Sequence, residues 1–314
     1  MVLEPEESFN GKAHPRLLDL MMKARASALG KEHALALVYP CDRLAMDAAQ
    51  HMRASGMVRP VLIGPRQLIE QAADQASVDW SHFELIDTGT LPQDAARQAT
   101  TLARNQNVQS IMKGSLHTDE LMSAVVNKET GLRTNCRISH TFLFDLPQCH
   151  KLLALTDCVV NISPDLRAKQ DILTNAVGFL QKLGIAEPKV GIVAAVETVN
   201  PAIVATLDAK ALVDMSRAGS WPGALVEGPL GFDNAISAQA ARIKKIESKL
   251  AGDADLLLMP DLNAGNMLYK SLIYIGGADC AGLVLGASVP IVLTSRADSL
   301  QSRLASVALA VLTS

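Results

Sequence analysis

Short apolar runs alternate with longer segments of helical periodicity along most of the 314 residues, and this alternation restricts the possible folds more than any other feature of the sequence. Ala34–Val38 and Pro60–Ile63 are apolar runs of strand length, and the segments that follow them, Arg43–Ser55 and Arg66–Gln75, have helical spacing. Strands buried on both faces have continuous apolar sequences, and strands that alternate with helices form βαβ units. The pattern therefore predicts an α/β protein whose sheets are mainly parallel.

The length of the chain and its hydrophobic content, 49% of the residues, are sufficient for two domains with separate cores. The pattern of strands and helices is interrupted most clearly near Pro147, and the last strand and helix are expected to complete the first domain. We predict a polar lead-in at residues 1–14, an α/β domain I at 15–147 plus 288–314, and an α/β domain II at 148–287.

Composition excludes several classes of function. A net charge of -3 and an aromatic content of 4% argue against a nucleic-acid-binding protein, which needs a basic surface or aromatic stacking platforms. The sequence has no apolar run long enough to span a bilayer, and its acidic start lacks the apolar core of a signal peptide. The five cysteines lack CxxC spacing, which favours a reducing compartment. We expect a cytoplasmic protein that acts on small molecules.

Polar residues follow two apolar runs near the C-terminus. Leu256–Met259 is followed closely by Asp261, and Pro290–Leu293 is followed directly by Thr294, Ser295 and Arg296. In open α/β sheets, ligands bind beyond the carboxyl ends of the strands. The segment that contains both strand ends is therefore our first candidate for the active site.

Cations with small Gly, Ser or Thr residues close by recur at the predicted strand ends and loops. Arginine forks match the oxygens of a phosphate group, and hydroxyl and backbone N–H groups supply further donors. Each cation could instead be a solvated surface residue, although the position of Arg296 directly after a buried strand favours a functional role. The cations are Lys113, Arg133, Arg137, Lys270 and Arg296.

Other polar side chains have two interpretations each. His117 could act as an acid, a base or an orienting group, or it could be a structural histidine. Asp157, Asp233 and Asp261 could bind a metal together with a substrate, but carboxylates at such turns usually cap helices or hold loops, so we expect no metal. Tyr269 could line a pocket or pack in the core.

Common nucleotide-binding and hydrolase motifs are missing from the sequence. It contains neither a P-loop nor a G-x-G-x-x-G fingerprint, so nucleotide hydrolysis and ordinary dinucleotide binding lose their usual support. It also has no G-x-S-x-G nucleophile elbow. Ser295 is therefore expected to donate a hydrogen bond to a developing oxyanion rather than to act as a nucleophile.

Together, several motifs resemble the phosphate acetyl/butyryltransferase family, in the order in which that family has them. They are MKGSLHTDELM, TGLRTNCRISH, LTDCVVNISPDL, AAVETVNP, EGPLGFDNAIS, AGDADLLLMPDLNAGNMLYKSL and PIVLTSRADS. They extend from about residue 35 to the end of the chain, and details resemble the butyryltransferase branch and the transacylase part of MaoC-fused enzymes. The combination of PDLNAGN with SRADS is quite specific for the family.

The resemblance implies reversible transfer of a short acyl group, such as acetyl, propionyl or butyryl, between coenzyme A and inorganic phosphate, which gives acyl phosphate by direct thiolate attack in a ternary complex. It also implies two three-layer α/β/α domains of the isocitrate/isopropylmalate dehydrogenase-like architecture with an active-site cleft between them, and a homodimer. Coenzyme A and phosphate are substrates in this family, so no cofactor or metal is expected.

The resemblance also assigns roles to residues. It implies that Ser295 and Arg296 stabilise the transition state and that Arg137 and Ser139 bind phosphate. In phosphotransacetylases an aspartate seven residues after the serine is the proposed base for the thiol, but this chain has Ser302 there, which favours the butyryl-like branch. We expect further substrate-binding residues at Lys113, Ser115, Tyr269 and Lys270. We expect cleft-lining residues at His117, Asp157, Asn161, Asp233, Asp261, Asn266 and Asp298.

Two alternatives belong to other classes of function. A metal- and NAD(P)-dependent decarboxylating dehydrogenase would share the predicted architecture, but it needs a metal site that the sequence does not clearly offer. A non-catalytic acyl-CoA or acyl-phosphate binding protein would follow if the change at Ser302 had abolished turnover. The retention of Ser295, Arg296 and Arg137 favours the enzyme.

Overall fold

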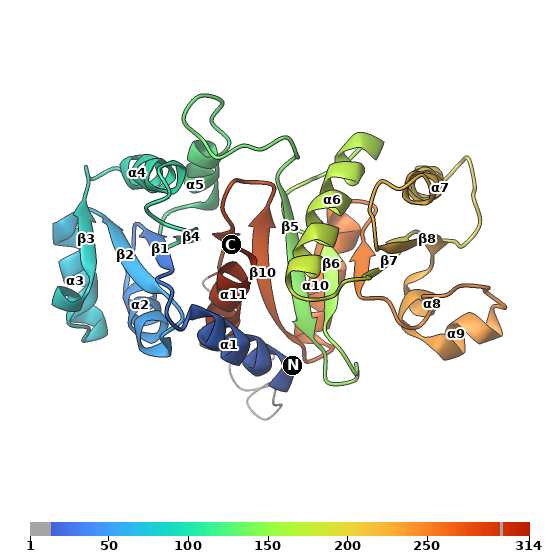
Figure 1. The fold of residues 1–314 in the computed structure, drawn as a ribbon, viewed down its shortest axis with the longest axis horizontal. Helices are drawn as coiled ribbons and strands as arrows, with labels where there is room; N and C mark the ends of the chain where they lie inside the picture. Colours follow the sequence, from blue (N-terminus) through green and yellow to red (C-terminus); the bar gives the residue numbers. More distant parts are fainter. Residues whose placement is uncertain (1–13, 296–297) are drawn as a thin grey trace, which may run out of the picture. The chain divides into compact units, whose positions relative to one another are not determined.

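The computed structural model describes residues 14–295 and 298–314, and it contains two compact units (Figure 1). Unit I consists of Leu17–Asn135 and Ala281–Ser314, and unit II consists of Cys136–Cys280 together with residues 14–16. The predicted divisions between domains fell later along the chain, after residues 147 and 287. Both units have the α/β architecture that the alternating sequence predicts.

Unit I contains a mainly parallel sheet with the strand order β3-β2-β1-β4-β11-β10. Neighbouring strands from β3 to β11 run parallel, and the short pair β10–β11 is antiparallel. The five residues of β1 are all buried, as its apolar sequence predicts. The bounds are β1 Ala34–Val38, β2 Arg59–Gly64, β3 Glu84–Asp87, β4 Ser110–Lys113, β10 Asp279–Leu285 and β11 Ile291–Val292.

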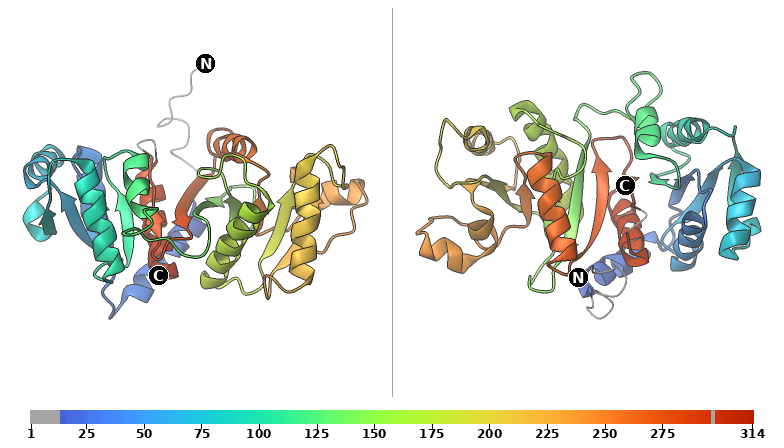
Figure 2. Two further views of the ribbon diagram at one scale, coloured as in Figure 1. Left: turned by 90° about the horizontal axis from the view of Figure 1, so that it is seen from above. Right: turned by 180° about the vertical axis from the view of Figure 1, so that it is seen from behind.

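Helices pack on both faces of this sheet, as the views in Figure 2 show. One group contains α2, which contacts both α3 and α11, and the other pairs α4 with α5. Local signals explain where α2 begins and ends: the Asp42 carboxylate accepts from the N–H of Ala45, and Gly56 ends the helix at a φ of 70°. The bounds are α1 Pro15–Ala28, α2 Arg43–Ser55, α3 Arg66–Ala76, a 3-10 turn at Trp80–His82, α4 Pro92–Arg104, α5 Thr118–Val125 and α11 Leu300–Thr313.

In unit II the strands lie in the order β5-β6-β9-β7-β8. Its strands are parallel except for β5, which pairs antiparallel with β6. The strands are β5 Ser139–Asp145, β6 Leu153–Thr156, β7 Lys189–Val193, β8 Leu225–Leu230 and β9 Leu256–Leu258. The helices are α6 Leu166–Lys182, α7 Val204–Arg217, α8 Phe232–Ile236, α9 Ala238–Ile243 and α10 Leu262–Tyr274.

Two local features of unit II are not apparent from the pattern of apolar residues. Cys158–Val160 is not a strand, because the Asp157 carboxylate accepts the N–H groups of Val159 and Val160 and holds them in a bend. Residues 235–250 are not one helix, because α8 ends at Ile236 and the hydroxyl of Ser237 caps a separate helix, α9. In both places a short polar side chain bonds to the local backbone in place of regular structure.

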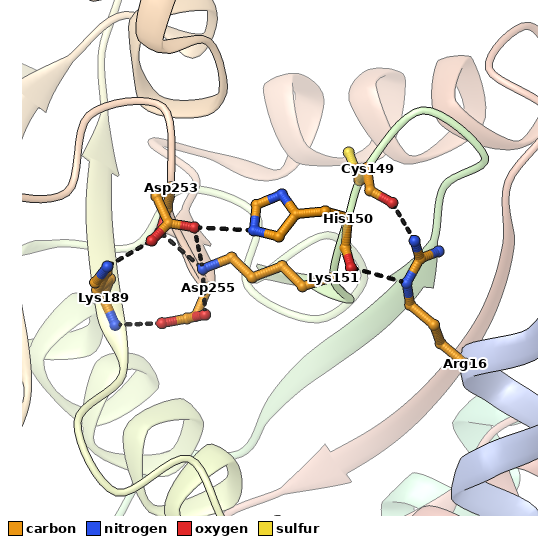
Figure 3. Close-up of polar contacts among 7 residues, drawn as sticks. All are labelled: Arg16, Cys149, His150, Lys151, Lys189, Asp253 and Asp255. Atoms are coloured by element: carbon orange, nitrogen blue, oxygen red, sulfur yellow. Dashed lines mark hydrogen bonds and ion pairs between the residues drawn. The ribbon is translucent and has the colours of Figure 1, made fainter.

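Ion pairs join the amino ends of three parallel strands in unit II (Figure 3). Lys151, just before β6, contacts Asp253 at 2.8 Å and Asp255 at 2.6 Å. Lys189, the first residue of β7, contacts Asp253 at 2.5 Å, and its backbone N–H donates to Asp255. The two lysines lower the pKa of Asp253 to about 2. This network stabilises the edge of the sheet opposite to the carboxyl ends of β6, β7 and β9.

None of the helices in the described part of the chain is long and apolar enough to cross a membrane.

Candidate active site

Arg137, in unit II, lies directly before β5 and is held at three points. Its backbone N–H donates to Asp171 at 3.2 Å, and its carbonyl accepts from Asn175 at 2.8 Å. Its side-chain Nε donates to Oδ1 of Asn161 at 2.7 Å. Because the residue is exposed, the terminal nitrogens of the guanidinium group can reach a ligand.

Asp157 follows β6 and is 3% exposed. Its Oδ1 accepts from the N–H groups of Val159 and Val160, and its Oδ2 accepts from the N–H of His140 and from both the N–H and the Nδ2 of Asn161. Five donors converge on one buried carboxylate, so its oxygens are directed at the protein rather than at a ligand. The structure therefore gives this predicted cleft-lining residue the role of an anchor for the loop.

Two residues near Arg137 are buried. Ser139, expected in the phosphate pocket, is 0% exposed, and its Oγ accepts from Asn175 at 2.9 Å. His140 is 1% exposed, and burial lowers its pKa to about 4, although the nearby Asp157 opposes this shift. Its Nδ1 is one of three buried side-chain atoms without a hydrogen-bond partner in the described residues; the others are Oγ1 of Thr141 and Oδ1 of Asn234.

The PDLNAGN motif forms the start of α10 and fixes it against the loop of residues 157–161, which we call the Asp157 loop. Asp261 is the N-cap of the helix, and its Oδ1 accepts from the N–H of Ala264 at 3.0 Å. Asn266 donates to the carbonyl of Cys158 at 3.2 Å. A Cβ on Gly265 would lie 2.6 Å from the carbonyl oxygen of Asp157, so only glycine allows this close approach. The motif therefore builds and positions the loop.

The remaining predicted residues of unit II have different surroundings. Tyr269 stacks on Phe142 with ring centroids 4.4 Å apart and packs against the core cluster, whereas Lys270 is exposed on the same helix. Asp233 contacts Lys244 at 2.9 Å, and the hydrogen bond from that lysine lowers its pKa. Tyr269 therefore has the packing role that was one of its two interpretations.

In unit I, Ser295 and Asp298 bond to each other. Oδ2 of Asp298 accepts from the N–H of Ser295 at 2.6 Å, and the carbonyl of Ser295 accepts from the N–H of Asp298 at 3.2 Å. Arg303, on α11, donates to the carbonyl of Ser295 at 2.9 Å and to that of Asp298 at 3.3 Å. Ser295 is exposed, whereas Arg296, the other predicted catalytic residue, lies outside the described residues.

Three further predicted residues lie at the end of β4 or just after it in unit I. Lys113 donates to the carbonyls of Gly114 and Leu116 at 3.1 and 3.2 Å, and Ser115 donates to the carbonyl of Tyr39 at 2.7 Å. His117 is the exposed N-cap residue of α5. A pocket at the carboxyl ends of β1, β4 and β11 brings Lys113 and Ser295 together. Its lining is Leu37, Asp42, Leu44, Ala45, Ala48, Met112, Lys113, Gly114, Thr294, Ser295 and Arg303.

Comparison with known proteins agrees with the sequence motifs. Residues 88–311 match the family model described as phosphate acetyl/butaryl transferase. The phosphate acetyltransferase of Rhizobium meliloti is 47% identical over 91% of both chains. The phosphate butyryltransferase of Clostridium acetobutylicum is 36% identical, over 94% of this chain and 96% of that one.

The chain belongs to the phosphate acetyl/butyryltransferase family.

A solved structure supports the same conclusion at the level of the fold. The branched-chain phosphotransacylase of Enterococcus faecalis V583 is 27% identical and superposes with a TM-score of 0.79, over 90% of this chain and 98% of that one. The mainly parallel α/β architecture predicted from the sequence is thus confirmed.

This member of the family groups its predicted site residues into two clusters, one in each unit. In unit II, Arg137 and Asn161 are in direct contact, and Asp157, Asn266 and Asp261 fix the adjoining loop. Asp233 is part of a separate ion-pair group with Lys244 and Glu197. In unit I, Lys113 and Ser295 share a pocket.

Three residues with a part in this arrangement were not predicted. Asn175 bonds to the backbone of residue 137 from α6, and Arg303 bonds to the carbonyl of Ser295 from α11. Asp42 lies in the pocket with Lys113. Arg303 stands shortly after the SRADS motif, and this position was a signal that the sequence offered. Nothing in the spacing of the sequence indicates Asn175.

At the position of the family's proposed base, Ser302 is 6% exposed and lies in the first turn of α11, where its N–H donates to Oγ of Ser299. Among the described residues, no group of three or more His, Cys, Asp or Glu side chains could hold a metal ion.

Proposed function

We propose that this family member transfers a short acyl group between coenzyme A and inorganic phosphate, with acyl phosphate and free coenzyme A as the products of one direction. Its identity of 47% to a phosphate acetyltransferase over nearly the whole chain supports the reaction. One observation supports placing the phosphate site at Arg137: the residue is exposed, and its Nε donates to Asn161 at 2.7 Å. A fixed guanidinium fork is suited to a phosphate group.

In the proposed reaction, Arg137 and Arg296 hold phosphate, and Ser295 donates a hydrogen bond to the carbonyl oxygen while negative charge develops there. In the direction of acyl-CoA synthesis, the thiolate sulfur attacks the carbonyl carbon of the acyl phosphate, a C–S bond forms, and the C–O bond to phosphate breaks. In the opposite direction a phosphate oxygen attacks the thioester and releases the thiolate. When the tetrahedral centre collapses, the negative charge passes to the leaving group. That group is phosphate in the first case and the thiolate sulfur in the second.

The proposal does not require a carboxylate at residue 302. A free thiol has a pKa of about 8.5, so a fraction of coenzyme A is already ionised near neutral pH. Cations nearby lower a thiol pKa further. We propose that Lys113 and Lys270, both cations of the predicted set, assist in binding the anionic substrates. Ser115, Ser139 and Tyr269 are assigned to fixing loops and packing rather than to contact with substrate.

We also propose a homodimer in the cytoplasm that needs no cofactor besides its two substrates. Exposed apolar residues on α10 and just after it, namely Met267, Tyr274 and Ile275, are of the kind that a second copy covers. The five cysteines are free thiols, as a reducing compartment would keep them. Light scattering on the purified protein measures the oligomeric state.

A thiol-release assay tests the proposed activity. Acetyl-, propionyl- and butyryl-CoA are each incubated with the protein, with and without inorganic phosphate, and free thiol is measured over time. We expect release that depends on phosphate, and the ranking of the three substrates gives the preferred chain length. Binding of coenzyme A without release from any of them would favour the non-catalytic binding protein instead.

A further inference from the structure

Asn161 connects a buried carboxylate to an exposed cation. It is 5% exposed, and it lies between Asp157, which is 3% exposed, and the guanidinium of Arg137. Its side chain bonds to both neighbours, at 2.6 Å to Oδ2 of Asp157 and at 2.7 Å to Nε of Arg137. A buried amide with two short contacts of this kind has one defined position.

The orientation of the amide follows from its donors. Nδ2 has two hydrogens, and it donates to Oδ2 of Asp157 at 2.6 Å and to the carbonyl of Ile138 at 3.0 Å. Both partners can only accept, so they fix which end of the amide is nitrogen. The oxygen Oδ1 must therefore point to Nε of Arg137.

This contact uses Nε of Arg137 and leaves the two terminal nitrogens available to a bidentate ligand. Nε lies at the base of the guanidinium group, whereas two terminal nitrogens form one edge of the fork. Within residues 14–295 and 298–314, Asn161 is the one side chain that hydrogen-bonds to this guanidinium. The asparagine thus orients the plane of the group without occupying the terminal edge.

The loop that carries Asn161 is itself fixed from two sides. Asp157 accepts from the N–H groups of Val159, Val160 and Asn161. Asn266 on α10 donates to the carbonyl of Cys158 in the same loop. A residue held in this way transmits a defined position to its partner, as the supporting residues of a binding site must.

We infer that Asn161, anchored by the buried Asp157, is a positioning residue that aims Arg137 at inorganic phosphate and thereby sets the affinity of the enzyme for that substrate. The inference rests on the proposed function and adds to it: neither side chain of the pair Asp157–Asn161 contacts the substrate, and both act through Arg137. Phosphate binding depends on the pair, whereas binding of the acyl group does not.

The experiment compares steady-state kinetics of the wild-type protein with those of Asn161→Ala, with phosphate and acyl-CoA varied separately. Because hydrogen bonds to charged groups are the stronger ones, we expect KM for phosphate to rise about ten-fold or more. KM for acyl-CoA should stay within about two-fold of wild type. Asn127→Ala is the matched control, since the exposed Asn127 accepts two backbone N–H bonds in a turn and should change neither KM.

A double-mutant cycle separates positioning from general loosening of the structure. If Asn161 acts through the Nε of Arg137, then adding Asn161→Ala to Arg137→Lys should raise KM for phosphate by less than two-fold more, because lysine has no Nε donor in that place. Additive effects would overturn the inference. So would a wild-type KM for phosphate in Asn161→Ala, or an equal rise in both KM values.

A further variant covers the case in which Asn161→Ala does not fold. Asn161→Asp keeps the size of the side chain but places a carboxylate oxygen against Oδ2 of Asp157 in place of the Nδ2 donor, so the anchor is lost. KM for phosphate should rise as for alanine while KM for acyl-CoA stays within about two-fold of wild type, and a wild-type KM for phosphate would contradict the inference. Absence of phosphate-dependent thiol release from the wild-type protein would instead refute the proposed function, so the two failures are distinguishable.

Discussion

The two clusters of predicted site residues are built in opposite ways. Arg137 is held by a buried network in which Asp157 accepts five hydrogen bonds. Ser295 lies in an exposed turn, where Asp298 accepts its N–H and Arg303 donates to its carbonyl. Buried polar groups that lose a partner carry a large free-energy penalty, whereas exposed groups can bond to water. Stability and activity should therefore be coupled in the first cluster and separable in the second.

The two clusters also differ in which part of the residue is held, the side chain or the backbone. In unit II a side chain, Asn161, bonds to the side chain of Arg137 and sets its orientation. In unit I, Asp298 accepts the backbone N–H of Ser295 and Arg303 donates to its carbonyl, so these bonds fix the main chain of the residue. A cation aimed by a neighbour suits the binding of one anion, and a hydroxyl on a fixed main chain suits a hydrogen bond that strengthens as charge develops.

The largest expected effect is that of Asp157→Ala. The substitution leaves four backbone N–H groups without their acceptor, including those of the buried His140 and Asn161. The free energy of unfolding should therefore fall by about 3–5 kcal/mol, and thiol release should fall with it. Asp298→Ala, the matched change in the exposed turn, should lower the free energy of unfolding by only about 1 kcal/mol while it also lowers thiol release. Urea unfolding and the thiol assay measure the two quantities.

Similar losses of stability in these two variants would contradict the proposed contrast between a buried and an exposed cluster. A stable Asp157→Ala protein with normal turnover would show that the five bonds to the carboxylate matter little.

Gly265→Ala tests the close packing of α10 against the Asp157 loop. The new Cβ would lie 2.6 Å from the carbonyl oxygen of Asp157 and 3.1 Å from Cα of Cys158, and both are backbone atoms that cannot move aside alone. We expect a loss of about 1–3 kcal/mol in the free energy of unfolding, as for overpacked cores. Gly178→Ala on α6 is the control: a Cβ there meets no atom within 4 Å, so higher helix propensity should stabilise the protein by up to about 1 kcal/mol.

The smallest expected effect is on pH dependence, and each unit has one histidine that contributes. Burial lowers the pKa of His33 in unit I and of His140 in unit II to about 4, below the value of about 6.5 for an exposed histidine. Between these values the unfolded chain binds more protons than the folded one. The stabilisation is therefore complete above pH 6.5 and is lost as the pH falls toward 4, by at most about 1.4 kcal/mol per pH unit for each histidine.

Urea unfolding at pH 7 and pH 5 measures this dependence. His33→Gln and His140→Gln should each reduce the difference between the two midpoints. If neither variant changes the difference, other groups cause the pH dependence. Asp253 is not among them, because its titration, with a pKa of about 2, lies below this window.

The sequence predicts the fold well where the hydrophobic pattern alone decides it. The apolar runs Ala34–Val38 and Leu256–Met259 are found as β1 and β9. The pattern does not indicate the bend at Cys158–Val160 or the break between two helices at Ser237, because a side chain there competes for backbone hydrogen bonds. An apolar run and a helical period carry no information about that competition.

The candidate site was likewise predictable in part. Arg137 and Asn161 were predicted as site residues, and the structure joins them directly. The sequence could not distinguish a ligand-facing carboxylate from a buried anchor, so Asp157 was expected to line the cleft. Asn175 was not predicted because it reaches the carbonyl of residue 137 from a helix 38 residues further along the chain. Contacts of that kind depend on packing rather than on spacing.

The most direct test of the proposed acyl transfer is the amount of acyl phosphate formed for each thiol released. The protein is incubated with an acyl-CoA and inorganic phosphate, acyl phosphate is trapped with hydroxylamine and measured as the hydroxamate, and free thiol is measured in the same sample. The proposed function predicts one acyl phosphate for each thiol, and no thiol without phosphate. Thiol release without acyl phosphate, at the same rate with and without phosphate, would show a thioester hydrolase and contradict it.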